Sequence, residues 1–318
     1  MARVLVTGGA GFIGSNLTEA LLERGHLVRV LDNFSTGKRE NLIFDRTYPL
    51  FEVIDGDVRD LPTCQKATKG IDYVFHQAAI PSVQRSIENP VASHSVNVDG
   101  TLNVLVAARD EGVKRWVYAS SSSVYGDTPS LPKNEEMPSH PLSPYALQKF
   151  VGEGYGQLFY QLYGLETVSL RYFNIFGPKQ DPSSVYSGVI SRFIDALLEG
   201  DPPVVFGDGE QSRDFTYVDN VVQANLLAMS REHSHGEVIN VACGRRISLN
   251  QLLDILQKIL RSRTLPVYQD ARRGDVRHSL ADIQKGKHLL GYEPVVGTEA
   301  GLNHTVEYFR AKREKGLK

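Results

Sequence analysis

RVLVTGGAGFIG, residues 3–14, is the stretch that decides the fold of this chain. The apolar run Arg3–Thr7 leads into three regularly spaced glycines, and an amphipathic stretch follows them. Glycine tolerates the tight turn between a strand and a helix, and it lets backbone N–H groups approach a pyrophosphate. The N-terminus of the following helix adds partial positive charge. The sequence therefore predicts a dinucleotide-binding turn made of Gly8, Gly11, Phe12, Ile13 and Gly14.

A carboxylate at the end of the second predicted strand, Val28–Asp32, supports this prediction. Asp32 follows the turn at the spacing, about 20 residues, at which an acidic side chain binds the adenosine ribose hydroxyls. The same carboxylate would repel a 2′-phosphate, so Asp32 favours NAD over NADP as the cofactor. Arg39 is an argument in the other direction, because a nearby arginine can accommodate that phosphate.

Short apolar runs alternate with helical patterns through the first half of the chain. The runs lack the alternation of half-buried strands, which indicates strands buried on both faces. Such alternation is typical of an α/β protein with a Rossmann-type, doubly wound parallel sheet. The predicted strands are Arg3–Thr7, Val28–Asp32, Phe51–Asp55, Tyr73–His76, Arg115–Ser120 and Thr167–Arg171, and the predicted helices are Ile13–Glu23, Asn89–Glu111 and Pro144–Tyr163.

After Arg171 the pattern changes to a proline-rich, loop-rich stretch with one clear helix, Val189–Glu199. A buried strand, Glu237–Ala242, and a helix, Leu249–Leu260, come later, and a polar loop is expected over Tyr268–Arg277. We therefore predict a smaller C-terminal α/β substrate domain. The expected division is residues 1–172 for the NAD-binding domain, to which 214–243 are also expected to return, and residues 173–213 and 244–318 for the substrate domain.

Composition excludes several classes of protein. Hydrophobic residues make up 41% and charged residues 23%, which suits a globular chain and argues against disorder. A net charge of -2 gives no field that would attract nucleic acid or a membrane. No apolar run approaches the roughly 20 residues of a membrane helix. Cys64 and Cys243 are the only cysteines, and we expect a reduced, cytoplasmic protein without a metal site.

Further cofactor candidates follow the other predicted strands, because ligands bind at the carboxyl ends of parallel strands. Asp57 and Val58 come after the third strand and are placed near the adenine. Gln77, Ala78 and Ala79 come after the fourth, where small residues leave room for the cofactor.

Tyr145 and Lys149 open the predicted helix Pro144–Tyr163 and are four residues apart, so they share a helix face. A nearby lysine cation and a positive nicotinamide both favour the phenolate of a tyrosine, which otherwise titrates near pH 10. Tyr145 is therefore a candidate general base for a sugar hydroxyl. Four serines, residues 120–123, follow the strand Arg115–Ala119 and can place a hydroxyl beside it.

The motifs TGGAGFIG, SSSSVYGD, SPYALQK and RYFNIFGP together resemble the extended short-chain dehydrogenase/reductase family, and more narrowly the UDP-hexose 4-epimerases. The resemblance covers nearly the whole chain. Further segments, among them HQAAIPSVQRSIENP and GDGEQSRDFTYV, look most similar to the bacterial UDP-N-acetylglucosamine 4-epimerases.

The resemblance implies roles for matching residues. It makes Ser121 the catalytic hydroxyl, with a neighbouring serine left open as the alternative, and Tyr145 and Lys149 the base and its partner. Asn174, Arg213 and Arg272 would contact the diphosphate and Asp275 the uridine ribose. Ser279 would leave room for an N-acetyl group at C2 of the sugar. The remaining candidates are Ser82, Ser122, Gln180 and Val189 for the substrate, and Asn33, Asn97 and Tyr172 for the cofactor.

The implied activity is NAD-dependent 4-epimerisation of UDP-GlcNAc and UDP-GalNAc, and of UDP-Glc and UDP-Gal, through a 4-keto intermediate. A 4,6-dehydratase is disfavoured because Ser122 and Ser123 occupy the places of its extra acid and base. A UDP-glucuronate 4-epimerase or decarboxylase stays open, since Arg85 could contact a C6 carboxylate, as does a non-catalytic NAD-binding regulator. Related enzymes also imply a homodimer that pairs Asn89–Glu111 and Pro144–Tyr163 in a four-helix bundle.

Overall fold

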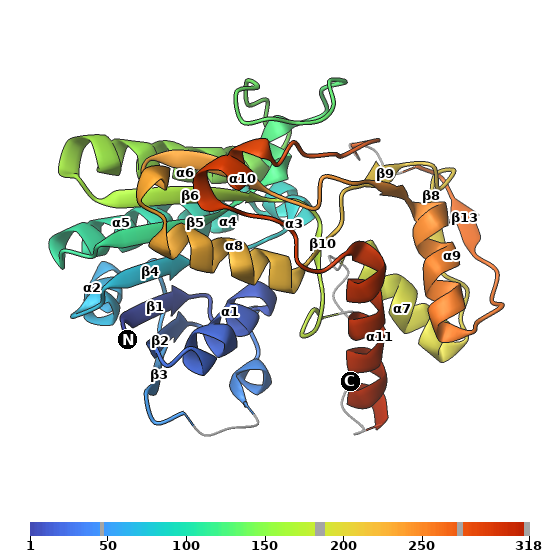
Figure 1. Ribbon diagram of the computed structural model, residues 1–318, viewed down its shortest axis with the longest axis horizontal. Coiled ribbons are helices and arrows are strands. Elements are labelled where there is room, and N and C mark those ends of the chain that lie inside the picture. Colours follow the sequence, from blue (N-terminus) through green and yellow to red (C-terminus); the bar gives the residue numbers. More distant parts are fainter. Residues whose placement is uncertain (45–47, 182–187, 272–275, 315–318) are drawn as a thin grey trace.

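The computed structural model describes residues 1–44, 48–181, 188–271 and 276–314, and its centre is a seven-stranded sheet (Figure 1). All pairings in this sheet are parallel, in the order β11-β6-β5-β4-β1-β2-β3. The strands are β1 (Arg3–Thr7), β2 (Leu27–Asp32), β3 (Phe51–Asp55), β4 (Tyr73–His76), β5 (Arg115–Ser121), β6 (Glu166–Tyr172) and β11 (Glu237–Val241). The predicted Rossmann-type, doubly wound sheet is confirmed.

Helices cover both faces of the sheet. One face carries α1 (Phe12–Glu23), α8 (Val218–Ser230) and α10 (Gln284–Leu290), and the other carries α2 (Leu61–Thr68), α5 (Gly100–Asp110) and α6 (Pro144–Tyr163). Successive residues of β1 point to opposite faces, so that Val4 and Val6 pack under α1 while Leu5 packs against the other layer. This arrangement explains why β1 is a continuous apolar run.

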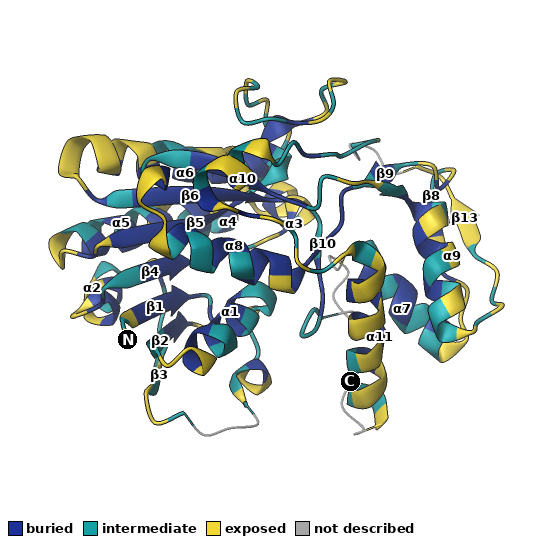
Figure 2. Cartoon of the chain, in the orientation of Figure 1, coloured by how far each residue is buried: buried dark blue, intermediate teal, exposed yellow. Residues whose placement is uncertain are grey.

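The strand β3 differs from the prediction of a strand buried on both faces. Glu52 and Val53 are exposed, because β3 is the last strand of the sheet beyond β2. The exposed β3 is visible at the lower edge of the sheet in Figure 2.

The predicted helix Asn89–Glu111 is divided into three segments. Asn89 caps α4 (Pro90–His94), a π-helical segment η2 covers Ser95–Asp99, and α5 begins at Gly100. Gly100 packs against Val58, and a Cβ atom at Gly100 would lie 2.6 Å from a Val58 methyl group. This close packing requires a glycine at position 100. The helical periodicity predicted that the residue is helical but not that it must be a glycine.

A smaller lobe lies beside the carboxyl ends of the sheet strands (Figure 1). Its core joins α7 (Val189–Glu199), α9 (Leu249–Leu260) and α11 (Thr298–Glu314) with β8 (Val204–Phe206). Three short pairs complete it: β7 (Ile175–Phe176) with β10 (Thr216–Tyr217), β9 (Ser212–Arg213) with β12 (Ile247–Ser248), and β8 with β13 (Val267–Gln269). The polar loop predicted from Tyr268 thus begins inside a strand.

The remaining elements are short. They are the helix α3 (Val83–Glu88) and the 3-10 turns η1 (Arg39–Leu42), η3 (Ser122–Tyr125) and η4 (Glu232–Ser234). After the first segment of the small lobe the chain returns to the sheet. There α8 covers one face of the sheet and β11 pairs with β6. Where the two predicted domains begin and end stays a prediction.

Candidate active site

The glycine turn connects β1 to α1 with almost no free space. Gly8 has a φ of +67°, and its carbonyl oxygen accepts a hydrogen bond from the Gly11 N–H over 3.1 Å. A Cβ atom at Gly14 would lie 2.2 Å from that oxygen, and one at Gly8 would lie 2.6 Å from the backbone nitrogen of Ala78. No side chain caps the N-terminus of α1 at Gly11. The turn therefore presents backbone N–H groups to an anion, as a pyrophosphate requires.

Asp32 lies beside this turn and is only 8% exposed. Its carboxylate accepts hydrogen bonds from the Ala10 N–H (2.9 Å) and the Phe34 N–H (2.8 Å). Burial raises the pKa of Asp32, and these two hydrogen bonds oppose the rise. The carboxylate has further acceptor positions for ribose hydroxyls.

Arg39 contacts a different carboxylate. Its guanidinium lies 2.5 Å from Asp55 and 3.8 Å from the centroid of the Phe34 ring. The charge that could attract a 2′-phosphate is therefore partly neutralised, and the pair supports NAD.

The candidates for the adenosine end lie after β2 and β3. The Asn33 amide donates to Asp57 over 2.8 Å, and Arg59 also pairs with that carboxylate over 2.7 Å. The hydrogen bond from Arg59 is the main reason that the pKa of Asp57 is lowered to about 2. Val58 is buried beneath them.

Two predicted cofactor residues engage in hydrogen bonds within the protein. The Gln77 amide donates to the Tyr172 hydroxyl (3.1 Å) and to Asn225 (3.3 Å). Asn97 accepts from the Ile80 N–H over 2.8 Å and donates to Gln148 on α6 over 2.8 Å. Asn97 thus connects the loop after β4 to α6, the helix of Tyr145. No pattern in the sequence predicted this connection.

The remaining candidates of the cofactor pocket surround the turn. Ala78 and Ala79 follow β4, and the Ala78 N–H donates to the Thr7 hydroxyl over 3.3 Å. In the first turn of α1, Phe12 packs against the small-lobe core and Ile13 against the sheet. Phe12 therefore joins the glycine turn to the second lobe.

Tyr145, Lys149 and Ser121 meet at the end of β5. Lys149 is 3% exposed and donates to the Ala119 carbonyl oxygen over 2.7 Å. Its ammonium lies 6.0 Å from the centroid of the Tyr145 ring. Burial lowers the pKa of Lys149 to about 7. Burial raises the pKa of Tyr145, and a hydrogen bond with Ser121 lowers it.

The four serines have different environments. Ser121 accepts from the Ser123 N–H over 3.2 Å and from the Ser123 hydroxyl over 2.9 Å. Ser120 is buried and donates to Glu153 over 2.5 Å. Ser122 is half-buried in η3. Among the described contacts of the Tyr145 hydroxyl, the one serine of this group that forms a hydrogen bond is Ser121.

A cavity of about 250 Å³ in the small lobe collects four of the predicted substrate residues, and its lining includes Asn174, Gln180, Val189 and Arg213. Asn174 follows β6, whose Tyr172 lies opposite Ser121 of β5 in the sheet. The cavity is thus adjacent to the carboxyl ends of β5 and β6. Asn174 has a φ of +42°, and its amide lies 3.5 Å from the Ser279 hydroxyl.

The other substrate candidates lie elsewhere. Ser82 caps α3 by accepting from the Arg85 N–H over 3.1 Å, and α3 contacts the catalytic helix because Ser86 accepts from the Tyr145 N–H over 3.0 Å. Arg272 and Asp275 lie outside the described residues.

Sequence reasoning missed several residues that line the cavity, above all Phe206 and Gln211, which flank the GDGE segment. An aromatic ring and an amide suit a nucleobase, the ring by stacking and the amide by hydrogen bonding. A phenylalanine just before a glycine-rich turn was the available signal.

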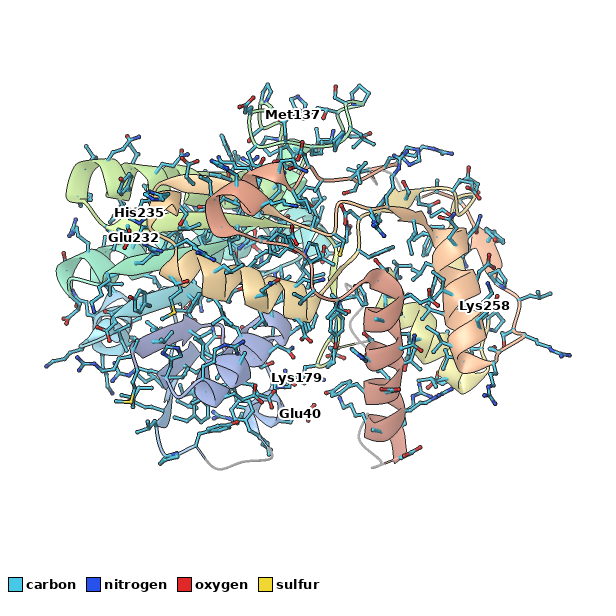
Figure 3. All side chains as sticks on the ribbon, viewed as in Figure 1. Glu40, Met137, Lys179, Glu232, His235 and Lys258 are labelled. Carbon is cyan, nitrogen blue, oxygen red and sulfur yellow. The ribbon has the colours of Figure 1, made fainter. Side chains whose placement is uncertain are left out.

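Ion pairs connect the two lobes near the glycine turn. Lys179 pairs with Glu19 of α1 over 2.8 Å, and Lys38 pairs with Asp181 over 3.0 Å. Lys312 of α11 lies 3.4 Å from Glu40. Figure 3 shows Lys179 and Glu40 in the region between the sheet lobe and α11. The loop that carries Gln180 is therefore held on both sides by the cofactor-binding lobe.

Two properties of residues 1–44, 48–181, 188–271 and 276–314 bear on the class of protein. None of the helices there combines the length and apolar character needed to cross a membrane. That part of the chain also contains no cluster of three or more His, Cys, Asp or Glu side chains suited to a metal ion.

The NAD dependent epimerase/dehydratase family matches residues 4–242, and the chain belongs to this family. The UDP-glucose 4-epimerase of Mycolicibacterium smegmatis is 39% identical over 314 residues, which cover 98% of this chain and 100% of that protein. A UDP-glucuronate 4-epimerase of Thermodesulfobacterium geofontis is 35% identical over 99% of this chain and 98% of its own. The UDP-N-acetylglucosamine 4-epimerase of Methanobrevibacter ruminantium M1, solved with UDP-N-acetylmuramic acid, superposes with a TM-score of 0.93 at 41% identity, covering 98% and 99% of the two chains.

The family resemblance expected from the motifs and the dependence on NAD are thereby confirmed. The glycine turn and Asp32 fit that cofactor, because a close-approach turn and a ribose-binding carboxylate lie side by side.

Proposed function

We propose that the chain interconverts UDP-hexoses at C4, with UDP-GlcNAc and UDP-GalNAc as its main substrates and UDP-Glc and UDP-Gal as further ones. One observation carries the proposal: Tyr145 is hydrogen-bonded to Ser121 above a buried lysine, at the strand end that adjoins the Asn174–Arg213 cavity. A candidate base and a cavity of about 250 Å³ thus lie beside the same strand ends of the sheet.

In the proposed reaction, Tyr145 takes the proton of the C4 hydroxyl while the Ser121 hydroxyl holds the same oxygen. Lys149 stabilises the phenolate by its positive charge. The nicotinamide, when bound, supplies a reversible two-electron oxidation at C4. The cavity keeps the nucleotide fixed by remote binding contacts while the 4-keto sugar turns over.

The activity test follows products by NMR after wild-type protein is incubated with UDP-GlcNAc or UDP-Glc without added cofactor. We expect epimerisation of both, and loss of turnover by a factor of roughly 100 or more in Tyr145→Phe. Tyr163→Phe is the matched control, because Tyr163 lies on the same helix and its side chain is 52% exposed. Normal turnover in Tyr145→Phe would refute the assigned base.

Ser279 supports the choice of N-acetylated substrates. Its hydroxyl lies beside Asn174, a lining residue of the cavity, and a serine there occupies little volume. Ser279→Tyr should lower kcat/KM for UDP-GlcNAc far more than for UDP-Glc, and Ser279→Ala should leave the ratio within about threefold. An unchanged ratio in the tyrosine variant would remove the support for N-acetyl selectivity.

Two alternatives have specific outcomes. Arg85 on α3, which packs against α6, could contact a C6 carboxylate, and one relative is a UDP-glucuronate 4-epimerase. If the protein converts UDP-glucuronate but none of the neutral UDP-hexoses, it is a UDP-glucuronate 4-epimerase or decarboxylase. Tight NAD binding with no turnover of any UDP-sugar would indicate a non-catalytic regulator.

We also propose a homodimer. Large apolar side chains are exposed on adjacent helices α3, α4 and α6, and α6 packs against both of the others. These side chains are Val83 (45%), Ile87 (56%), Val91 (78%), Leu147 (51%) and Phe150 (41%). A second copy of the same face would bury them in a helix bundle. Solution scattering at micromolar concentration should give a dimer mass for the wild type and a monomer mass for Phe150→Glu. A monomeric wild type would refute the proposal.

A further inference from the structure

A buried ion pair connects the helix of Tyr145, α6, to the strand β6. Glu153 is 2% exposed and Arg171 is 4% exposed. The Arg171 guanidinium donates from Nε to Glu153 Oε1 and from a terminal nitrogen to Oε2, each over 2.8 Å. The same guanidinium lies 4.5 Å from the centroid of the Tyr125 ring. The carboxylate is therefore held in one orientation by a fork of two hydrogen bonds.

A third hydrogen bond connects this pair to the catalytic strand end. The Ser120 hydroxyl donates to Glu153 Oε1 over 2.5 Å. Ser120 lies between Ala119, whose carbonyl oxygen accepts from Lys149, and Ser121, which is hydrogen-bonded to Tyr145. In the sheet, Ser120 is directly opposite Arg171 of β6. Glu153 thus fixes the backbone segment that holds both the lysine and the reactive hydroxyl.

Glu153 also faces Lys149 along α6. The two residues are four apart on one helix, so their side chains share a face. The other groups around Lys149 are uncharged at neutral pH. Tyr118 of β5 presents its ring 4.8 Å from the ammonium, and the Tyr145 ring lies at 6.0 Å. Burial lowers the pKa of His76 on β4 to about 3, so that imidazole is neutral.

The electrostatic balance at Lys149 follows from these contacts. Burial disfavours an ammonium and is the main reason that the pKa of Lys149 is lowered, to about 7 when all of its surroundings act together. The negative charge of Glu153 acts in the opposite direction and raises that pKa. Without this carboxylate, more of the lysine would be neutral at the pH where the reaction runs.

We propose that Glu153, oriented by Arg171, is a positioning residue of the reaction, which keeps Lys149 a cation and fixes the Ala119–Ser121 strand end around it. The proposal rests on the proposed function, because it assigns Lys149 and Ser121 their parts in proton transfer at C4. Glu153 itself touches neither substrate nor cofactor in this assignment.

A stabilising role alone is a weak explanation for the pair. Two buried charges lose so much hydration that their attraction often only balances the loss. A second arginine–glutamate pair, whose carboxylate is more exposed, lies at the other end of the same two strands. Arg115 on β5 donates to Glu166 on β6 over 2.9 and 2.7 Å. This second pair has the same chemistry and lies far from Lys149 along β5, so Glu166 provides a matched control.

The test compares Glu153→Gln with Glu166→Gln as NAD-loaded proteins, and it measures kcat for UDP-GlcNAc across pH. In Glu153→Gln we expect the alkaline limb of the kcat profile to move to lower pH, with kcat reduced roughly tenfold more at about pH 8 than at about pH 6. KM should stay within about twofold, because the cavity is unchanged. Glu166→Gln should keep the wild-type profile. A wild-type profile in folded Glu153→Gln would overturn the proposal.

A second readout does not depend on turnover. Nζ resonances of the lysines are followed by NMR across pH, and the Lys149→Met variant assigns the signal of Lys149. Its titration midpoint should fall in Glu153→Gln and return toward the wild-type value in Glu153→Asp, which restores the charge. An unchanged midpoint overturns the proposal whatever the activity. If wild-type protein turns over no UDP-sugar, the proposed function fails, and the midpoint alone then decides whether Glu153 acts on Lys149.

If Glu153→Gln does not fold, Glu153→Asp serves as the test variant. It keeps the negative charge but draws the carboxylate back by one methylene from Ser120. We then expect a nearly unchanged alkaline limb and a uniformly reduced kcat, because the charge remains while the strand end is less well fixed. A wild-type kcat in this variant would overturn the assigned contact with Ser120.

Discussion

Gly14→Ala tests the dinucleotide-binding turn most directly. The new Cβ atom would lie 2.2 Å from the Gly8 carbonyl oxygen and 2.9 Å from two further backbone atoms of the turn. Cβ atoms essentially never approach within 3.0 Å of such atoms, so the turn must open by about 0.8 Å at its narrowest point. Because the obstacle is backbone, no side-chain rotation can relieve the contact.

The expected size of the effect follows from overpacking. Forcing one methyl group into a filled site costs about 1–3 kcal/mol. If the turn opens in the free protein, this energy is lost from NAD binding, which corresponds to a roughly five- to hundredfold higher Kd. If the surrounding structure shifts instead and keeps the binding geometry of the turn, the same energy is lost from the free energy of unfolding.

Calorimetric titration of nucleotide-free protein with NAD, together with denaturant unfolding, measures both quantities. Gly297→Ala is the control, because nothing lies within 4 Å of a Cβ atom at that position. It should change the Kd for NAD by less than about twofold. Wild-type values of both Kd and unfolding free energy in Gly14→Ala would refute the close-approach argument.

Two further predictions concern buried titratable groups. His76 has its pKa lowered by burial from 6.5 to about 3, so the unfolded chain binds an extra proton between those values. Stability should therefore fall as the pH drops from 6.5 toward 3, by up to about 1.4 kcal/mol per pH unit, and urea unfolding of His76→Gln should show a flatter profile in that window. Asp214 is fully buried, accepts hydrogen bonds from three backbone N–H groups, and has its pKa raised by burial to about 7. Asp214→Asn replaces an acceptor oxygen by an NH₂ group facing donors and should cost roughly 3 kcal/mol of unfolding free energy, measured at neutral pH; a loss below about 0.5 kcal/mol would contradict this account of the site.

Much of the fold could be predicted because its signals are local. The glycine spacing, the continuous apolar strands and the position of Asp32 are all determined by neighbouring residues. The exposed β3 could not be predicted, because its run of residues resembles that of a central strand and only the sheet order makes it an edge. The π segment η2 contains Asn97, whose hydrogen bond to Gln148 on α6 is a tertiary contact that helical periodicity does not predict.

The same distinction applies to the candidate site. Tyr145 and Lys149 share one helix, so their spacing alone predicted that they lie together. The environment of Lys149 could not be predicted, since Glu153 acquires its orientation from Arg171 on β6 and Ser120 on β5. The cavity likewise combines residues from distant segments, and the glycine-rich turn after Phe206 does not by itself place that ring beside Asn174 and Arg213.

The ion pairs between the lobes connect one wall of the cavity to the surroundings of the glycine turn. The loop of Gln180 is tied to α1 through Lys179 and to the segment after β2 through Lys38. If NAD orders that segment, it also orders one wall of the cavity lined by Asn174 and Arg213, and linkage requires a ligand of that cavity to tighten NAD by the same factor. Because these pairs are partly exposed, added salt weakens them and should reduce that mutual effect. NAD would then be retained more strongly while the cavity is occupied than while it is empty.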